Sequence, residues 1–183
     1  MFGFGRTAIP SHELAEVLSN AALRPLMNPT AQDDLFQTQA VAVGMHKTQF
    51  LLEATALQYF TVAASIGTRL LEGGIKPEQA SSLMEAMFLS FHQKFHDELP
   101  ASLKSAFLSL GLNVDAVLDF ISERYNEYSS PENSTNAHKR IPRLFAQFCD
   151  VPDPNDVLQR IGWSIFAIRG NVYMDMLKGL KVV

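Results

Sequence analysis

One run of apolar residues limits what this chain can fold into. From Phe50 to Ile66 it reads FLLEATALQYFTVAASI, and Glu53 is its only charged residue. A helix built from this run has apolar or small side chains on nearly every side. It therefore lacks a broad face for solvent and must be wrapped by other helices. The run predicts a buried helix at the centre of the fold.

The helix should extend beyond this run in both directions. Residues recur at three- and four-residue spacing, as in Gln39, Ala42, His46, Gln49 and Glu53. That period is helical. Thr30 and Asp33 resemble a capping box at its start, and the glycine pair 73–74 ends it. The sequence predicts one long central helix over residues 33–72.

A membrane-spanning role is not expected for this helix. A bilayer core needs roughly 20 consecutive apolar residues, and a carboxylate in mid-span is costly. Glu53 and Gln58 interrupt the run, which is also too short. We expect a core helix, with Gly44 and Gly67 as the positions at which it would break.

Shorter amphipathic segments supply the other helices. N-terminal signals at Ser11, Pro77 and Asn113 each precede an apolar stripe, a short helix is expected over 101–110, and Pro142 is expected to begin another. The stripe of the helix that follows Pro77 is Ala80, Met84, Met87, Phe88, Phe91 and Phe95. The stripe of the last helix, from about Asp156, is Leu158, Ile161, Ile165, Ile168, Val172 and Met176.

These patterns predict an all-α protein with a single domain over residues 1–183. It should be a helical bundle or orthogonal array of about six or seven helices around the 33–72 helix. Residues 1–9 should form a flexible arm, in which Phe2 and Phe4 alternate with glycines. This arm would dock on its own domain or on a partner.

Composition excludes some classes of function. A net charge of −4 and a pI near 5.7 do not favour nucleic-acid binding, which usually needs a basic field. A single cysteine, Cys149, cannot form an internal disulfide, and we expect it to be a small buried apolar side chain. The first residues lack the apolar core of a signal peptide. A cytoplasmic protein that binds neither nucleic acid nor membrane is expected.

A first candidate site consists of Glu85, His92 and His96. His92 and His96 are four residues apart on one predicted helix, and Glu85 lies two turns before His92. Two imidazoles at this spacing can bind one metal ion, with Glu85 or another helix providing a third ligand. The alternative is that they are histidines at the boundary between core and solvent.

A second candidate site is the polar line His46, Gln49 and Glu53 on the central helix. A buried carboxylate must find donors or hold a proton. Glu53 could therefore line a ligand pocket near His46. The structural alternative is that Glu53 pairs with Arg69, Arg143 or Lys139, or faces a gap between helices.

A third candidate is the cluster His138, Lys139, Arg140 and Arg143 at a predicted helix start. Positive side chains at a helix N-terminus attract an anion or an acidic partner. A solvated basic face is the alternative. The sequence contains no phosphate-binding loop, nucleophile elbow or paired-cysteine motif.

Two functions remain open on these grounds. The first is a non-enzymatic binding or regulatory protein that acts through an apolar or aromatic surface, with another protein or a second copy of itself as partner. The second is a pocket protein that binds a metal, haem or an apolar small molecule near His46, Glu53, His92 and His96. The surroundings of Glu53 separate the two, because a satisfied ion pair there favours the first.

Overall fold

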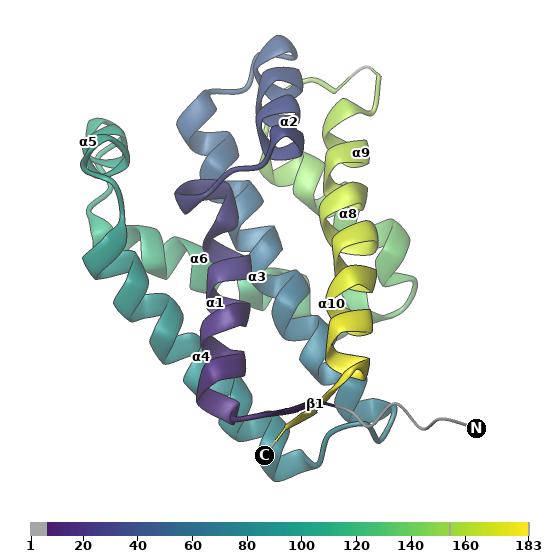
Figure 1. Cartoon of the computed structure of the whole chain (residues 1–183). Coiled ribbons are helices and arrows are strands. Elements are labelled where there is room, and N and C mark those ends of the chain that lie inside the picture. The colour runs from purple at the N-terminus through teal and green to yellow at the C-terminus, as the bar shows by residue number, and fades with distance from the viewer. Residues whose placement is uncertain (1–6, 154, 183) are drawn as a thin grey trace.

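The central helix organises the whole molecule. The computed structural model describes residues 7–153 and 155–182, and Figure 1 shows α3 running through the middle of the other helices. In chain order the helices are α1 (Ser11–Met27), α2 (Ala31–Ala42), α3 (Lys47–Leu71), α4 (Pro77–Glu98), α5 (Ala101–Ser109), α6 (Val114–Ser129), α7 (Pro131–Ser134), α8 (Ala137–Phe148), α9 (Val157–Trp163), the π-helix η1 (Ser164–Ile168) and α10 (Arg169–Lys178). The predicted class is confirmed: the chain is a single all-α domain packed around α3.

Helix α3 is buried along most of its length. Leu57, Val62 and Ile66 have no exposed surface. By length and composition α3 could cross a membrane, as could the bent pair α5 and α6 taken as one span, yet 89% of the most apolar window of α3 lies inside the fold. Because other helices cover nearly all of it, α3 acts here as the core helix that its sequence predicts.

The central helix is not continuous over residues 33–72. It breaks between α2 and α3, where Gly44 adopts a φ of +98°. A side chain disfavours this conformation and glycine does not. Thr30 and Asp33 form the expected capping box, but at the start of α2. The prediction of one helix is wrong, and the break lies at one of the two glycines proposed for it.

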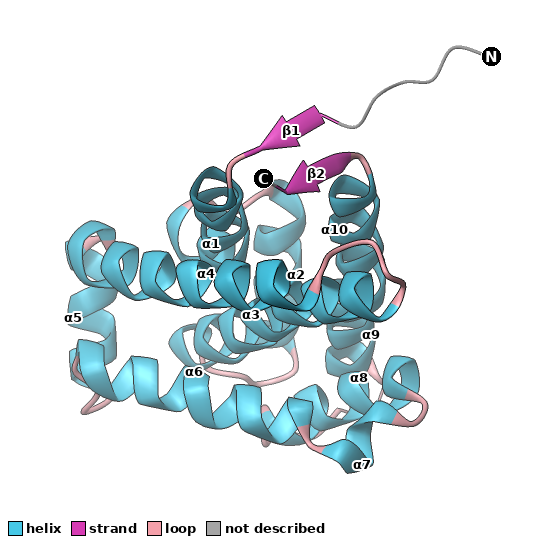
Figure 2. Ribbon diagram, turned by 90° about the horizontal axis from the view of Figure 1, so that it is seen from below, coloured by secondary structure: helices cyan, strands magenta, loops and turns pink. Residues whose placement is uncertain are grey.

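Two short strands, one near each end of the chain, form a feature that was not predicted. Strand β1 (Thr7–Ile9) pairs in parallel with β2 (Leu180–Val182), and Figure 2 shows the pair at one end of the molecule. Residues 7–9 are therefore not part of a flexible arm. Phe2 and Phe4 lie outside the described residues.

The last helix faces the core with a different stripe from the one predicted. Ile168 is 43% and Val172 60% exposed, whereas Arg169, Tyr173 and Leu177 are buried. The wide π-turn η1 holds one more residue than an α-turn. It therefore shifts every inward position after Ile165 by one residue.

Two other local predictions fail. Phe88 is 41% exposed and its ring lies 4.1 Å from that of His92, so it is not part of the buried face of α4. Pro142 lies inside α8 and does not begin it.

Candidate functional site

The buried carboxylate of the central helix is closed by an arginine from α6. Glu53 is 1% exposed, and Arg124 Nε donates to both of its oxygens, at 3.1 and 2.9 Å, while Nη2 donates to Oε1 at 2.9 Å. The guanidinium lies 4.0 Å from the ring centre of Phe148 and 4.8 Å from that of Phe120. Glu53 therefore belongs to a satisfied ion pair, with Arg124 and not Arg69, Arg143 or Lys139 as its partner.

The electrostatics around this pair leave its neighbours uncharged. Burial raises the pKa of Glu53, and the hydrogen bonds and charge of Arg124 oppose that shift. Burial also raises the pKa of Tyr128 and Cys149, and the charge of Glu53 raises both further. Cys149 is fully buried, as expected. A thiol of raised pKa is mostly protonated near neutral pH and is a weak nucleophile.

The residues of the polar line on α3 have separate surroundings. His46 is the N-cap of α3, where Nδ1 accepts a hydrogen bond from the Thr48 backbone N–H at 3.3 Å. Gln49 is half-buried. Neither these two residues nor Glu53 lines any of the cavities described below. The structure thus gives the pocket hypothesis no support at this position.

The two histidines of α4 have different partners. The His92 ring packs at a tilt against Phe88, and His96 Nε2 lies 3.4 Å from Asp115 Oδ1 on α6. Burial and the charge of His96 lower the pKa of His92, while Asp119 acts to raise it. Within residues 7–153 and 155–182, no three His, Cys, Asp or Glu side chains are placed to hold a metal ion. Glu85 has no ligand partners there.

A polar network inside the fold was missed by the sequence reasoning. Asp33 accepts a hydrogen bond from Arg169 Nη2 at 2.6 Å, and Arg169 Nη1 donates to Gln58 Oε1 at 3.1 Å. The Gln58 amide then donates to the hydroxyl of Tyr173. The π-turn places Arg169 and Tyr173 here, because both belong to the shifted stripe. The network ties α2 and α10 to the central helix.

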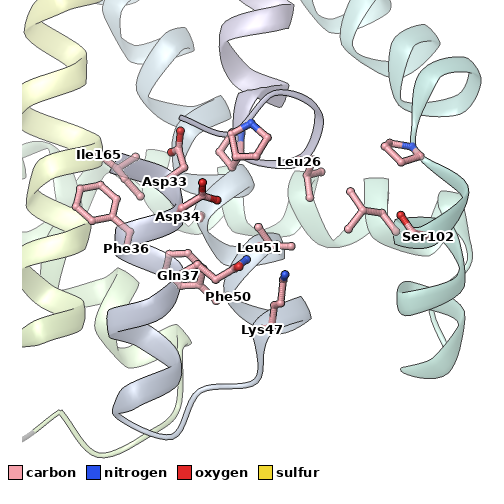
Figure 3. Close-up of a pocket in the computed structure, with 15 residues that line it drawn as sticks. Leu26, Asp33, Asp34, Phe36, Gln37, Lys47, Phe50, Leu51, Ser102 and Ile165 are labelled. Atoms are coloured by element: carbon pink, nitrogen blue, oxygen red, sulfur yellow. The ribbon is translucent and has the colours of Figure 1, made fainter. Parts of the chain in front are cut away.

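The cavity beside this network is small. It has about 220 Å³ and lies between α1, α2, α3, α5 and η1, with Leu26, Phe36, Phe50, Leu51 and Ile165 among its walls (Figure 3). Small-molecule sites usually enclose roughly 300–1,000 Å³. We therefore interpret it as a packing gap.

The predicted basic cluster forms part of a larger surface. A shallow depression of about 360 Å³ between α8 and α9 is lined by His138, Lys139, Pro142, Arg143, Gln159, Arg160 and Trp163; we call these residues the basic-aromatic surface. Arg140 is exposed beside it and donates to the backbone carbonyl of Glu132. Arg160 and Trp163 come from α9 and were not predicted.

Close helix packing brings the two halves of this surface together. A Cβ placed on Gly162 would lie 3.0 Å from Phe145 Cδ1, so only glycine lets α9 approach α8 this closely. Trp163 follows Gly162 directly and turns outward, with 47% of its surface exposed. Large exposed aromatic side chains beside arginine are typical of the residues that dominate protein interfaces.

The arginines of this surface differ from the others. Arg24, Arg69, Arg124 and Arg169 each pair with a carboxylate. The described arginines without such a partner are Arg140, Arg143 and Arg160, and all three lie on or beside the basic-aromatic surface. No carboxylate lines the depression within the described part of the chain. Its cations therefore have no ion-pair partner among the described residues. The adjoining depression, which shares Arg143 and Gln159 with this surface, contains Asp150, Asp153 and Asp156.

Comparisons with known proteins give no family for this chain. No protein-family model, no curated protein and no solved structure matches it.

Proposed function

We propose that this protein is a non-enzymatic binding protein that holds an acidic segment of a partner protein on the basic-aromatic surface. The observation that carries the proposal is the exposed Trp163 among cations that have no carboxylate partner in the described structure. The closed Glu53–Arg124 pair supports it as well, because the residue that best suited an internal pocket is already neutralised.

The arrangement suits a polypeptide with negative charge and an apolar side chain. Arg143 and Arg160 offer planar donors that match carboxylates in a bidentate geometry. Trp163 offers a large rigid face to an apolar side chain. Opposite charge across an interface guides association and orients the partner. Proteins that bind single-stranded nucleic acid stack successive bases on several aromatic side chains. This surface has only one exposed aromatic side chain among its described residues, which does not favour nucleic acid as the partner.

Trp163 also provides the assay. It is the single tryptophan of the chain, so tryptophan emission, excited where tyrosine does not absorb, reports only on this surface. The probe is a synthetic peptide in which glutamates flank one phenylalanine, with a lysine version of equal length as the charge control. We expect the glutamate peptide to change Trp163 emission, and added salt to weaken its binding.

Variants distinguish this surface from general attraction to charge. Trp163→Ala, followed by anisotropy of a labelled peptide, should weaken binding by roughly 30-fold, the equivalent of about 2 kcal/mol for a central aromatic contact. Arg160→Glu should weaken it strongly. Lys47→Glu changes the net charge equally at an exposed position on α3 and should have little effect.

Three results would contradict the proposal. One is equal binding of the glutamate and lysine peptides. Another is equal loss in Arg160→Glu and Lys47→Glu. The third is tighter binding of single-stranded DNA of matched charge, which would make nucleic acid the partner. Light scattering on the same samples tests whether a second copy of the chain is the partner.

A further inference from the structure

A second concave site is lined by other residues of α8, Ala137 and Ile141. A groove of about 550 Å³ is bounded by α3, α4 and the segment from the end of α6 to α8. Figure 2 shows α4 and α6 on either side of α3, with α7 following α6. Its volume falls within the usual range of small-molecule sites, roughly 300–1,000 Å³.

The lining of the groove has an apolar part and a polar part. The apolar part is formed by Phe60, Ala63, Ala64, Ile66, Gly67, Leu70, Pro77, Ala80, Met84, Tyr125, Tyr128, Ala137 and Ile141, and the polar part by Ser81, Ser129, Ser130, Asn133 and Ser134. The rings of Tyr125 and Tyr128 pack on Phe60, with centroids at 6.0 and 5.4 Å. Except for Ser81 on α4, the polar side chains come from the end of α6, from α7 and from the residue between them.

None of the described residues that line the groove carries a charge, although charged residues make up 19% of the chain. A carboxylate or ammonium group inside it would lose hydration without gaining an ionic partner, which is strongly unfavourable. The Asn133 amide donates to the Glu127 carbonyl, and the hydroxyls of Ser129 and Ser134 donate to backbone carbonyls. The oxygens of these side chains can still accept, so an uncharged hydroxyl group could donate a hydrogen bond to them. The lining thus favours a neutral molecule over a charged one.

The missing side chain of Gly67 helps to keep the groove open. It lies within α3, and a Cβ placed on it would meet no atom within 4 Å. Glycine is a poor helix former, and at Gly67 neither a close contact nor a positive φ requires it. A larger residue would fit the helix better and would project into the empty space. This differs from Gly162, whose neighbour Phe145 leaves no room.

We propose that this groove binds a neutral single-chain lipid, with its hydrocarbon chain against Phe60, Gly67 and Met84 and its uncharged hydroxyl end at Ser129, Ser130 and Asn133. The proposal is independent of the partner proposed for the basic-aromatic surface. The groove and that surface share no residue.

The test uses full-length protein and the neutral fluorophore N-phenyl-1-naphthylamine. The fluorophore should bind, and dodecanol should displace it at a concentration at least about tenfold lower than dodecanoate or dodecylammonium, because only the alcohol enters without an unpaired charge. These three competitors share one hydrocarbon chain. They therefore isolate the effect of the head group.

Variants locate the site and separate binding from folding. Gly67→Leu should weaken dodecanol binding by at least about tenfold, because the leucine side chain fills the space that the hydrocarbon chain would occupy. This variant should melt no lower than the wild type, because leucine is the better helix former. Thr68→Leu places the same side chain on the next residue, which does not line this groove, and should bind normally. Ser81→Phe blocks the facing wall from α4 and provides a second blocked variant.

Each contrary outcome overturns the proposal. If dodecanol does not displace the fluorophore, the groove does not bind a neutral lipid. If dodecanoate displaces it equally well, the uncharged lining does not select against charge. Normal binding by both blocked variants places the lipid elsewhere. A dimer that dissociates in Gly67→Leu would show that the groove is occupied by a second copy of the chain.

Discussion

Replacing Arg124 by methionine should destabilise the protein far more than replacing Glu53. Arg124→Met leaves the Glu53 carboxylate at 1% exposure without the three hydrogen bonds that now satisfy it. Removing one partner of a buried pair typically costs about 3–5 kcal/mol. Glu53→Met should cost less, because the Arg124 side chain is 23% exposed and keeps its contacts with Phe120 and Phe148.

Urea unfolding followed by circular dichroism measures these differences. A loss of about 3–5 kcal/mol moves the midpoint by roughly 1.5–2.5 M when the slope is about 2 kcal/mol per molar urea. The double variant Glu53→Met/Arg124→Met should recover most of the loss, since an apolar pair of similar volume often replaces a buried ion pair without penalty. Arg140→Met is the control: it removes an exposed arginine without a carboxylate partner and should change stability by less than about 0.5 kcal/mol.

The pH dependence of Arg124→Met provides the sharper test. Burial already raises the pKa of Glu53, and loss of Arg124 removes the interactions that oppose this rise. The folded variant therefore binds a proton more readily than the unfolded chain, whose Glu53 has its ordinary pKa of 4.5. The variant should gain stability relative to the wild type as pH falls from 7 towards 4.5, and the difference should level off below that. A loss below about 1 kcal/mol, or one that does not change with pH, would refute the reasoning.

Three further predictions concern other parts of the core. Burial acts to raise the pKa of Asp33, but hydrogen bonds from Thr30 and the charge of Arg169 lower it below its ordinary 3.8. Asp33→Asn should therefore lower the free energy of unfolding by about 3 kcal/mol near pH 7, as measured by urea unfolding. The difference from the wild type should fade as the pH drops below 3.8. Gly162→Val should cost about 1–3 kcal/mol from overpacking against its neighbour on α8, and a variant as stable as wild type would contradict the close packing. Deleting Ala167 within the π-turn should be tolerated, whereas deleting Val172 should unfold the protein, as thermal melts would show.

The sequence predicts the centre of this fold well because burial on all sides leaves a plain compositional signal. An apolar run such as the one around Leu57 cannot be satisfied by water, so its place in the core follows from its side chains alone. The break at Gly44 was also foreseeable, since glycine marks a position where φ can be positive. The β1–β2 pair was not foreseeable, because three-residue strands at opposite ends of the chain carry no local pattern.

Only the α8 part of the basic-aromatic surface could be predicted from the sequence. His138, Lys139, Arg140 and Arg143 are close in the sequence, so their charge was visible as a cluster. Arg160 and Trp163 join them only because α9 packs against α8 at Gly162, a contact between segments that no local pattern reports. Glu53 shows the same limit: its need for a donor followed from its burial, but Arg124 lies on another helix and could not be chosen from the sequence.

The π-turn is the common cause of two failures of the sequence prediction. Ile168 and Val172 were expected to face the core, and the buried Arg169 was not expected at all. A regular helix from Leu158 onward would bury Ile168 and Val172, and every residue between them supports that period. One extra residue in the turn Ser164–Ile168 moves the inward position to Arg169, and Arg169 then meets Asp33 and Gln58 inside the fold. The exposed isoleucine and valine and the buried arginine are therefore two consequences of the same insertion. Removal of Ala167 would shorten the π-turn to an α-turn, and Arg169 would then occupy the inward position of the regular helix. Because the shorter turn still presents Arg169 to Asp33, we expect this deletion to be tolerated.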